Sequence, residues 1–341
     1  MKRIAASCLA IGVCLGAAGA SAADPVTIKI SDHFPVNHII PTTITKPWMA
    51  RAGELSAAKI KFQHFPAQQL VKQTDALPAM QRRIVDIAFV IPGLFPTEFE
   101  LTGVAFLPGG YSTIAEGSAA LQRLVTHTAI RAEFAKAGAE PLLIVPFDAY
   151  EILSRDRLIR QPEDARGLRL RVAGDGQVAA ARALGATPVS IGAPEIYTAV
   201  QRGTLDGSLF PYSVATSYRM NEVAKFGTVG ANVAYGHGIY CASPEFWTAL
   251  DATYRDTLVR AATESAQPGF KAMDDTTLST IESFRKGGMT LVQVDQLPGG
   301  REAWDAALRP VREQWAADME AKGRPGKAVL RAWDEALKAA R

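Results

Sequence analysis

The sequence predicts an α/β protein built from two similar lobes, and two observations carry that prediction. Short β-rich segments alternate with helical segments in two stretches of the chain, which is typical of mainly parallel sheets covered on both faces. In addition, residues 79–89 and 199–209 share one pattern at an offset of 120 residues: Ala, an apolar residue, Gln-Arg, two spacers, an apolar residue, Asp and a short strand. Such self-similarity favours one supersecondary unit used twice, although many helix–turn–strand corners look alike.

The individual elements follow from the spacing of apolar residues. Alternating or short apolar runs predict strands, and 3.6-residue spacing predicts helices, in the order strand 26–30, helix 43–55, strand 60–64, helix 74–83 and strand 86–90. The same cycle returns as strand 168–172, helix 177–184, strand 188–191, helix 193–202 and strand 208–210. The last part of the chain is predicted to be mostly helical, with helices 252–266, 270–286 and 302–322 and strand 291–294.

Residues 1–22 have the three parts of a secretory signal peptide. Lys2 and Arg3 form a basic start, residues 4–19 are apolar, and Ala20-Ser21-Ala22 is a small-residue cleavage site. We therefore expect an exported protein that works in the periplasm. No later segment approaches the ~20 apolar residues of a membrane span, so we expect no stable membrane insertion. Two α/β lobes in an exported chain suggest a hinged binding protein that closes on a ligand.

The composition excludes some classes of partner. Without Lys2 and Arg3 the mature chain keeps 35 of the 37 basic residues against 34 acidic ones, so it is nearly neutral. A nucleic-acid partner would need a basic surface, and none is expected. Cys8 and Cys14 leave with the signal peptide, and Cys241 stands in an apolar run as a buried hydrophobe. No disulfide is expected.

Motifs that would mark an enzyme or a metal site are incomplete. Residues 174–179 match a dinucleotide-binding pattern between a strand and a helix, but no acid ends the next strand, so a glycine turn is the better interpretation. The five histidines lack metal-ligand spacing, and there is no Gly-x-Ser-x-Gly elbow. We therefore expect no cofactor, no metal and no enzyme. Catalytic residues drawn from distant positions stay an alternative.

Polar side chains just after the first strand are candidate ligand contacts. His33, Asn37 and His38 follow strand 26–30, and ligands of open α/β sheets bind beyond the carboxyl ends of strands. An ordinary solvated turn is the other interpretation.

Arg171 is the sharpest single candidate. It lies near the carboxyl end of strand 168–172 and alternates with apolar residues. An arginine on a covered strand needs an anionic partner or a cleft, and its planar fork matches a carboxylate. The alternative is an internal ion pair with Glu151 or Asp206.

Four groups of motifs occur together in this chain, namely Pro162–Val172, Leu184–Val189, Glu195–Gly207, and Phe65–Leu70 with Asp86–Ala88. They resemble the extracytoplasmic solute receptors of tripartite ATP-independent periplasmic (TRAP) transporters, over nearly the whole mature chain. The resemblance implies a type II-like periplasmic binding protein fold, with hinged lobes joined by crossing strands and a long hinge helix. It also implies an organic acid whose carboxylate is clamped by Arg171 and which is delivered to the membrane subunits.

The chain departs from that family at positions expected to contact the ligand. Phe210 stands where the family often has an Asn, with Tyr212 close behind, and Glu151 falls where sialic-acid receptors have a second arginine. With Tyr150, these residues are expected to line the cleft. They favour an aromatic or apolar monocarboxylate over a sugar acid or a dicarboxylate. The other interpretation is that Phe210 packs in the core.

The predicted division of the chain is lobe I over 23–148 with about 237–283, and lobe II over 149–236 with about 284–341. We expect a monomer that binds a small organic acid and hands it to a membrane permease. Two alternatives stay open: a secreted α/β enzyme acting on a carboxylate substrate, and a receptor that presents its ligand to a sensor kinase.

Overall fold

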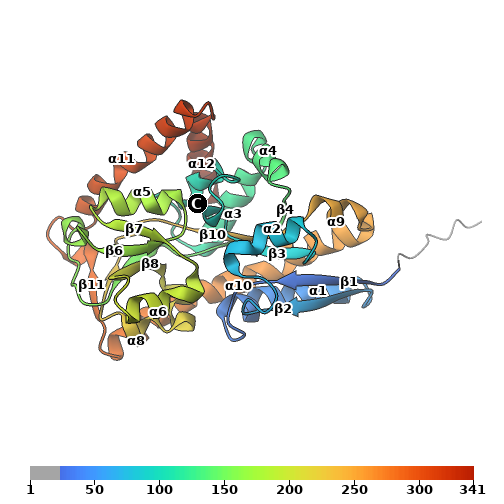
Figure 1. Ribbon diagram of the computed structural model, residues 1–341, viewed down its shortest axis with the longest axis horizontal. Helices are drawn as coiled ribbons and strands as arrows, with labels where there is room; N and C mark the ends of the chain where they lie inside the picture. The colour runs from blue at the N-terminus through green and yellow to red at the C-terminus, as the bar shows by residue number, and fades with distance from the viewer. Residues whose placement is uncertain (1–23) are drawn as a thin grey trace, which may run out of the picture.

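The computed structural model describes residues 24–341, so the predicted signal peptide lies outside the described residues. Two β-sheets lie side by side, each with its own helices, and the chain passes between them more than once (Figure 1). The predicted fold, two α/β lobes with crossing strands and a long helix, is confirmed.

The first sheet has the strand order β2-β1-β3-β10-β4. Its strands are β1 Val26–Ser31, β2 Ile60–Phe65, β3 Ile87–Val90, β4 Glu140–Pro146 and β10 His237–Ala242. β1 runs parallel to β2 and β3, whereas β10 is antiparallel to both of its neighbours. The helices between these strands and just after them are α1 Lys46–Leu55, α2 Ala76–Gln81, α3 Ile114–Val125, α4 Thr128–Lys136 and α9 Pro244–Ala249.

The second sheet has the order β11-β9-β5-β8-β6-β7. Its strands are β5 Tyr150–Ser154, β6 Arg169–Val172, β7 Thr187–Ser190, β8 Gly207–Pro211, β9 Phe226–Val229 and β11 Thr290–Gln293. β6 runs parallel to β7 and β8, and β5 is antiparallel to both of its neighbours. The helices that lie between these strands are α5 Asp175–Ala183, α6 Ile196–Gln201, α7 Tyr212–Ala215 and α8 Met220–Val223. The prediction of mainly parallel sheets is therefore corrected, because an antiparallel strand is built into the middle of each sheet.

The predicted repeat is visible in the backbone. The unit β1-α1-β2-α2-β3 has the same strand order and direction as β6-α5-β7-α6-β8. Asp86 Oδ2 accepts the backbone N–H of Lys29 at 2.8 Å, and Asp206 Oδ2 accepts that of Arg169 at 2.8 Å. Each carboxylate thus ties the turn before the third strand of its unit to the first strand of that unit.

Three segments connect the sheets. The chain crosses from β4 to β5 through 147–149 and returns from β9 to β10 through 230–236, where Tyr150 pairs with Ala234. The long helix α10, Ala252–Lys286, packs against α1 on one side and α7 on the other. The prediction of two helices over this stretch was wrong. Pro268 lies inside one continuous helix, which packing of its buried face against α1 and α7 maintains despite the lost backbone hydrogen bond.

The C-terminal helices are α11 Gly300–Ala321 and α12 Gly326–Ala340. α11 packs against α5, whereas α12 packs against α3 beside the first sheet. Of the described helices, none is long and apolar enough to cross a membrane.

Candidate ligand-binding site

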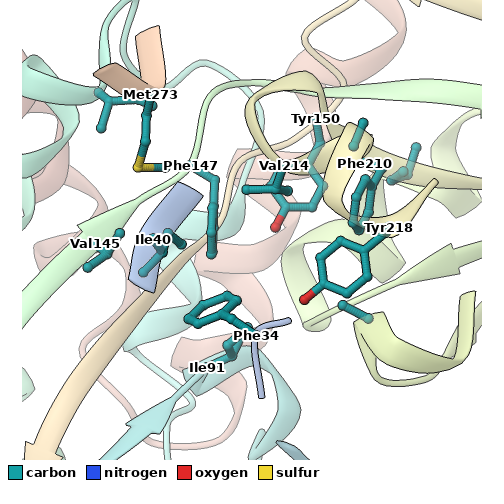
Figure 2. Packing of buried hydrophobic residues seen from close by; sticks show 14 of the residues in the cluster. Phe34, Ile40, Ile91, Val145, Phe147, Tyr150, Phe210, Val214, Tyr218 and Met273 are labelled. Atoms are coloured by element: carbon teal, nitrogen blue, oxygen red, sulfur yellow. The ribbon is translucent and has the colours of Figure 1, made fainter. Parts of the chain in front are cut away.

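A small cavity lies between the two sheets, at the carboxyl ends of β1, β3, β6 and β8. Most of its wall is aromatic or aliphatic, and its lining residues are His33, Phe34, His38, Ile91, Phe147, Tyr150, Arg171, Ala193, Phe210, Pro211, Val214 and Tyr218. Its volume is about 20 Å³, which is room for about one water molecule. Figure 2 shows the side chains of Phe34, Phe147 and Val214 around one space, with the hydroxyls of Tyr150 and Tyr218 directed toward it.

A larger groove of about 870 Å³ runs between α5 and α11, lined by residues such as Val178 and Trp315. Its charged groups, among them Arg182 and Asp318, lie at the protein surface, where water solvates them. The small cavity is the better candidate because it alone of these two holds a buried cation.

Arg171 is that cation. Its side chain comes from β6 and is 2 % exposed, its Nε donates to the carbonyl of Ile191 at 3.1 Å, and its guanidinium lies 5.7 Å from the centre of the Phe210 ring. Within 24–341 no carboxylate forms an ion pair with it. Burial lowers the pKa of Arg171, and the nearby hydroxyl groups of Tyr150 and Tyr218 oppose that shift.

The two acids considered as internal partners for Arg171 are engaged elsewhere. Asp206 holds the neighbouring Arg169 through Nε at 3.0 Å and Nη2 at 2.7 Å, at the exposed start of β6. The other acid, Glu151, accepts the Thr228 hydroxyl at 2.6 Å and three backbone N–H groups of residues 230–232. Burial raises the pKa of Glu151, and those hydrogen bonds oppose the rise. The carboxylate of Glu151 therefore organises the crossing segment and does not line the cavity.

The structure brings five of the eight predicted site residues together around the cavity: His33, His38, Tyr150, Arg171 and Phe210. It places the other three outside. Besides Glu151, Tyr212 is buried with its hydroxyl donating to the carbonyl of Thr228 at 2.9 Å, and Asn37 is exposed on the loop surface.

The loop that carries His33 and His38 is anchored by the buried carboxylate of Asp32. Its Oδ1 accepts the backbone N–H of Phe34 at 3.1 Å, and its Oδ2 lies 2.7 Å from His64 Nε2 and accepts the Tyr240 hydroxyl at 3.2 Å. The Phe34 ring then stacks on the His38 ring with centroids 4.4 Å apart. These contacts turn two imidazoles and one phenyl ring toward the second sheet.

Gln73 joins the two lobes and was missed by the sequence analysis. Its side chain is buried, Oε1 accepts the backbone N–H of Ala193 at 2.8 Å, and Nε2 lies 3.0 Å from His33 Nε2. Gln73 and Ala193 occupy equivalent positions of the repeat, so the 120-residue offset is the signal that pointed to this pair. Tyr218 and Phe147 were also missed, and no local pattern marks them.

The chain matches the family model described as DctP, bacterial extracellular solute-binding protein, family 7, over residues 30–318. The protein belongs to this family. Its members are periplasmic solute-binding proteins of TRAP transporters and not enzymes, so the predicted family, localisation and class are confirmed. Membership implies small solutes as ligands and membrane subunits as partners.

Individual relatives of this family 7 protein are distant. The C4-dicarboxylate-binding periplasmic protein DctP of Rhodobacter capsulatus is 25% identical over 315 residues, 88% of this chain and 89% of its own. A TRAP solute-binding protein from Rhodoferax ferrireducens with copurified benzoate matches with a TM-score of 0.84 at 21% identity, over 92% of this chain and 98% of its own. One from Bordetella bronchiseptica with bound (R)- and (S)-mandelate matches with a TM-score of 0.83 at 23% identity, over 93% and 100%.

Proposed function

We propose that this protein binds an aromatic or apolar monocarboxylate in the cavity between its sheets and delivers it to the membrane permease of a TRAP transporter. The observation that carries the proposal is Arg171, a guanidinium that is 2 % exposed and has no acidic partner in the described chain. An unpaired buried charge is costly, and a ligand carboxylate would neutralise it with a bidentate contact.

The wall of the cavity supports an apolar body on that carboxylate. Phe34, Phe147 and Phe210 face it together with aliphatic residues, so a flat ring would bury apolar surface worth ~25 cal/mol per Å². A sugar acid would bring hydroxyls against these rings, and each unpaired buried polar group costs about 1–3 kcal/mol. A dicarboxylate would find one guanidinium only among the lining residues. The benzoate and mandelate bound by two relatives point to the same ligand class.

The small volume of the cavity implies that the lobes open to admit the ligand. A Cβ added to Gly93, which follows β3, would lie 2.6 Å from the carbonyl oxygen of Ala173, which follows β6. Together with the Gln73–Ala193 hydrogen bond, this close approach closes the route between the sheets. We propose that the lobes, divided as the sequence predicts, rotate about the crossing segments and α10.

A calorimetric titration of the mature protein with benzoate, mandelate, a branched 2-oxo acid, succinate and galactonate tests the proposal. We expect the aromatic and branched acids to bind, and each to raise the free energy of unfolding by ~2.7 kcal/mol at a hundredfold excess over Kd. Tight succinate or galactonate binding with no response to any apolar acid would contradict the proposed ligand class.

A further inference from the structure

The protonation of His38 follows from its hydrogen bonds. The imidazole is fully buried, and its Nδ1 accepts the backbone N–H of Ile40 at 3.1 Å. Burial lowers the pKa of His38 to about 3, so the ring is neutral at physiological pH. A neutral imidazole has one donor and one acceptor nitrogen. Because Nδ1 is the acceptor, Nε2 carries the proton.

The protonation of His33 follows in the same way through Gln73. The Gln73 oxygen accepts the Ala193 N–H, so its amide nitrogen is a donor, and that nitrogen lies 3.0 Å from His33 Nε2. Burial, with the nearby His38 and Arg171, lowers the pKa of His33 well below its usual value. His33 Nε2 is therefore the acceptor, and Nδ1 carries the proton.

Neither of these two N–H groups finds an acceptor among residues 24–341. His38 Nε2 and His33 Nδ1 are both buried without a hydrogen-bond partner, and both rings line the cavity that contains Arg171. The Tyr218 hydroxyl, which points into the same space, also lacks a partner there (Figure 2). Buried donors are almost always satisfied, so such a cluster at the wall of a binding cavity indicates an acceptor brought by the ligand.

We propose that His33 Nδ1–H and His38 Nε2–H form a second polar subsite, which receives an oxygen acceptor of the ligand other than the carboxylate held by Arg171. This inference rests on the proposed function and deepens it. The preferred ligand is an aromatic acid that also carries a hydroxyl or oxo group, and benzoate lacks the group that the histidines bind. Each ring is fixed by its acceptor nitrogen, so the two donors hold their direction without a ligand.

The first test uses the unaltered protein and matched ligands. Calorimetric titration compares benzoate with mandelate, phenylglyoxylate and 3-hydroxybenzoate, which add one oxygen at different positions. We expect at least one of the three to bind ten times more tightly than benzoate or better. Equal or weaker binding of all three overturns the subsite alone. Failure of all four acids to bind overturns the proposed function and the subsite with it.

Two substitutions at His38 separate the donor from the backbone cap. His38→Asn keeps an acceptor near the Nδ1 position for Ile40 and removes the Nε2 donor. His38→Gln keeps a donor near the Nε2 position and removes the cap. We expect Asn to weaken binding of the best oxygenated acid about tenfold and benzoate less than twofold, and Gln to retain the discrimination. Equal losses for both ligands in the Asn variant would overturn the subsite.

The same pair of substitutions has the opposite meaning at His33. There Asn keeps a donor near Nδ1, and Gln keeps an acceptor near Nε2 for Gln73. We expect His33→Gln to lose the preference for the oxygenated acid and His33→Asn to keep it. A merely structural role would make the two variants at each position lose both ligands in parallel.

Discussion

The two copies of the repeated unit end differently, and that difference produces the site. By register, Ser31 at the end of β1 corresponds to Arg171 in β6, because each is paired with the second residue after its conserved-position aspartate, Asp86 or Asp206. In the first copy the chain leaves the strand through the loop that carries His33 and His38. In the second copy it enters α5 directly at Asp175. One copy therefore supplies neutral donors and the other supplies the charge.

This comparison shows that the repeat positions the edges and leaves the chemistry free to diverge. The Asp-to-strand hydrogen bond is the same in both copies, at 2.8 Å each. The residues beyond that bond face one another across the cavity because the two sheets meet at the carboxyl ends of these strands. A ligand then contacts a guanidinium on one side and two imidazoles on the other.

The largest expected effect comes from removing the charge of the second copy. A charge-assisted hydrogen bond is worth about 1.5–3 kcal/mol, so Arg171→Ala should weaken binding of the best acid about ten- to a hundredfold. Arg171→Lys should recover only part, since a point charge does not make the bidentate contact. Arg169→Ala is the matched control, because Arg169 lies on the same strand, is exposed and holds Asp206. Calorimetry that shows equal losses for Arg169→Ala and Arg171→Ala would break the comparison.

The shared aspartates test the equivalence of the two copies. Each accepts a backbone N–H of the first strand of its unit, so Asp86→Ala and Asp206→Ala should each lower the free energy of unfolding by about 1–2 kcal/mol. Asp206→Ala should cost slightly more, because it also releases the exposed Arg169 pair. Urea denaturation measures both variants. A large loss in one and none in the other would show that the units are alike in topology only.

Lobe closure depends on a glycine of the first copy that touches the second. A Cβ on Gly93 would lie 2.7 Å from Gly174 Cα and 2.9 Å from the Phe106 ring, so Gly93→Ala should disfavour the closed form. We expect affinity to fall about tenfold, equivalent to ~1.4 kcal/mol, and the radius of gyration with ligand to increase in small-angle scattering. Gly53→Ala is the control, because the nearest atom to its added Cβ is 3.8 Å away. Unchanged affinity in Gly93→Ala would argue against this contact as a determinant of closure.

The smallest effect concerns pH. Burial lowers the pKa of His38 and of His237 in β10 to about 3, so the unfolded chain binds more protons than the folded one between about pH 3 and 6.5. Stability contributed by neutral burial is complete above about pH 6.5 and is lost on acidification, by up to ~1.4 kcal/mol per pH unit for each histidine. Asp148 acts oppositely, since burial raises its pKa to about 6 and its contribution falls as pH rises from about 4 to 6.

Thermal unfolding between pH 4.5 and 7.5 measures this linkage. His237→Leu should show a shallower loss on acidification than the unaltered protein, because both ring nitrogens of His237 lack partners among the described residues. Ligand affinity should stay constant from pH 6 to 8, because the histidines of the cavity do not titrate there. A steep change of affinity across that range would contradict neutral donors on the first side of the site.

The sequence predicted the parts of the fold with regular local patterns. The segments that became β1 to β3 and β6 to β8 alternate with helices at recognisable spacing, and Arg171 stood out as a charge on an apolar strand. β10 was missed because His237–Ala242 is buried throughout and shows no alternation. Pro268 argued for a break that packing overrides.

The site was predictable where one residue type carried the argument, and not where distant segments meet. The ligand of the Glu151 carboxylate is a turn at 230–232, about eighty residues further along the chain, so its role as an anchor has no local signal. Tyr218 reaches the cavity because it follows α7, which packs on α10. Gln73 needed the structure to show that equivalent turns of the two copies touch.

The central claim is that the Arg171 charge recognises the ligand carboxylate, and a cycle of two ligands and two proteins tests it most directly. Benzoate and its neutral amide, benzamide, are titrated calorimetrically into the unaltered protein and into Arg171→Met. We expect the unaltered protein to prefer benzoate by about a hundredfold, and Arg171→Met to bind the two ligands within a few-fold of each other. A strong preference for benzoate that survives in Arg171→Met would contradict the claim and place the carboxylate against another group.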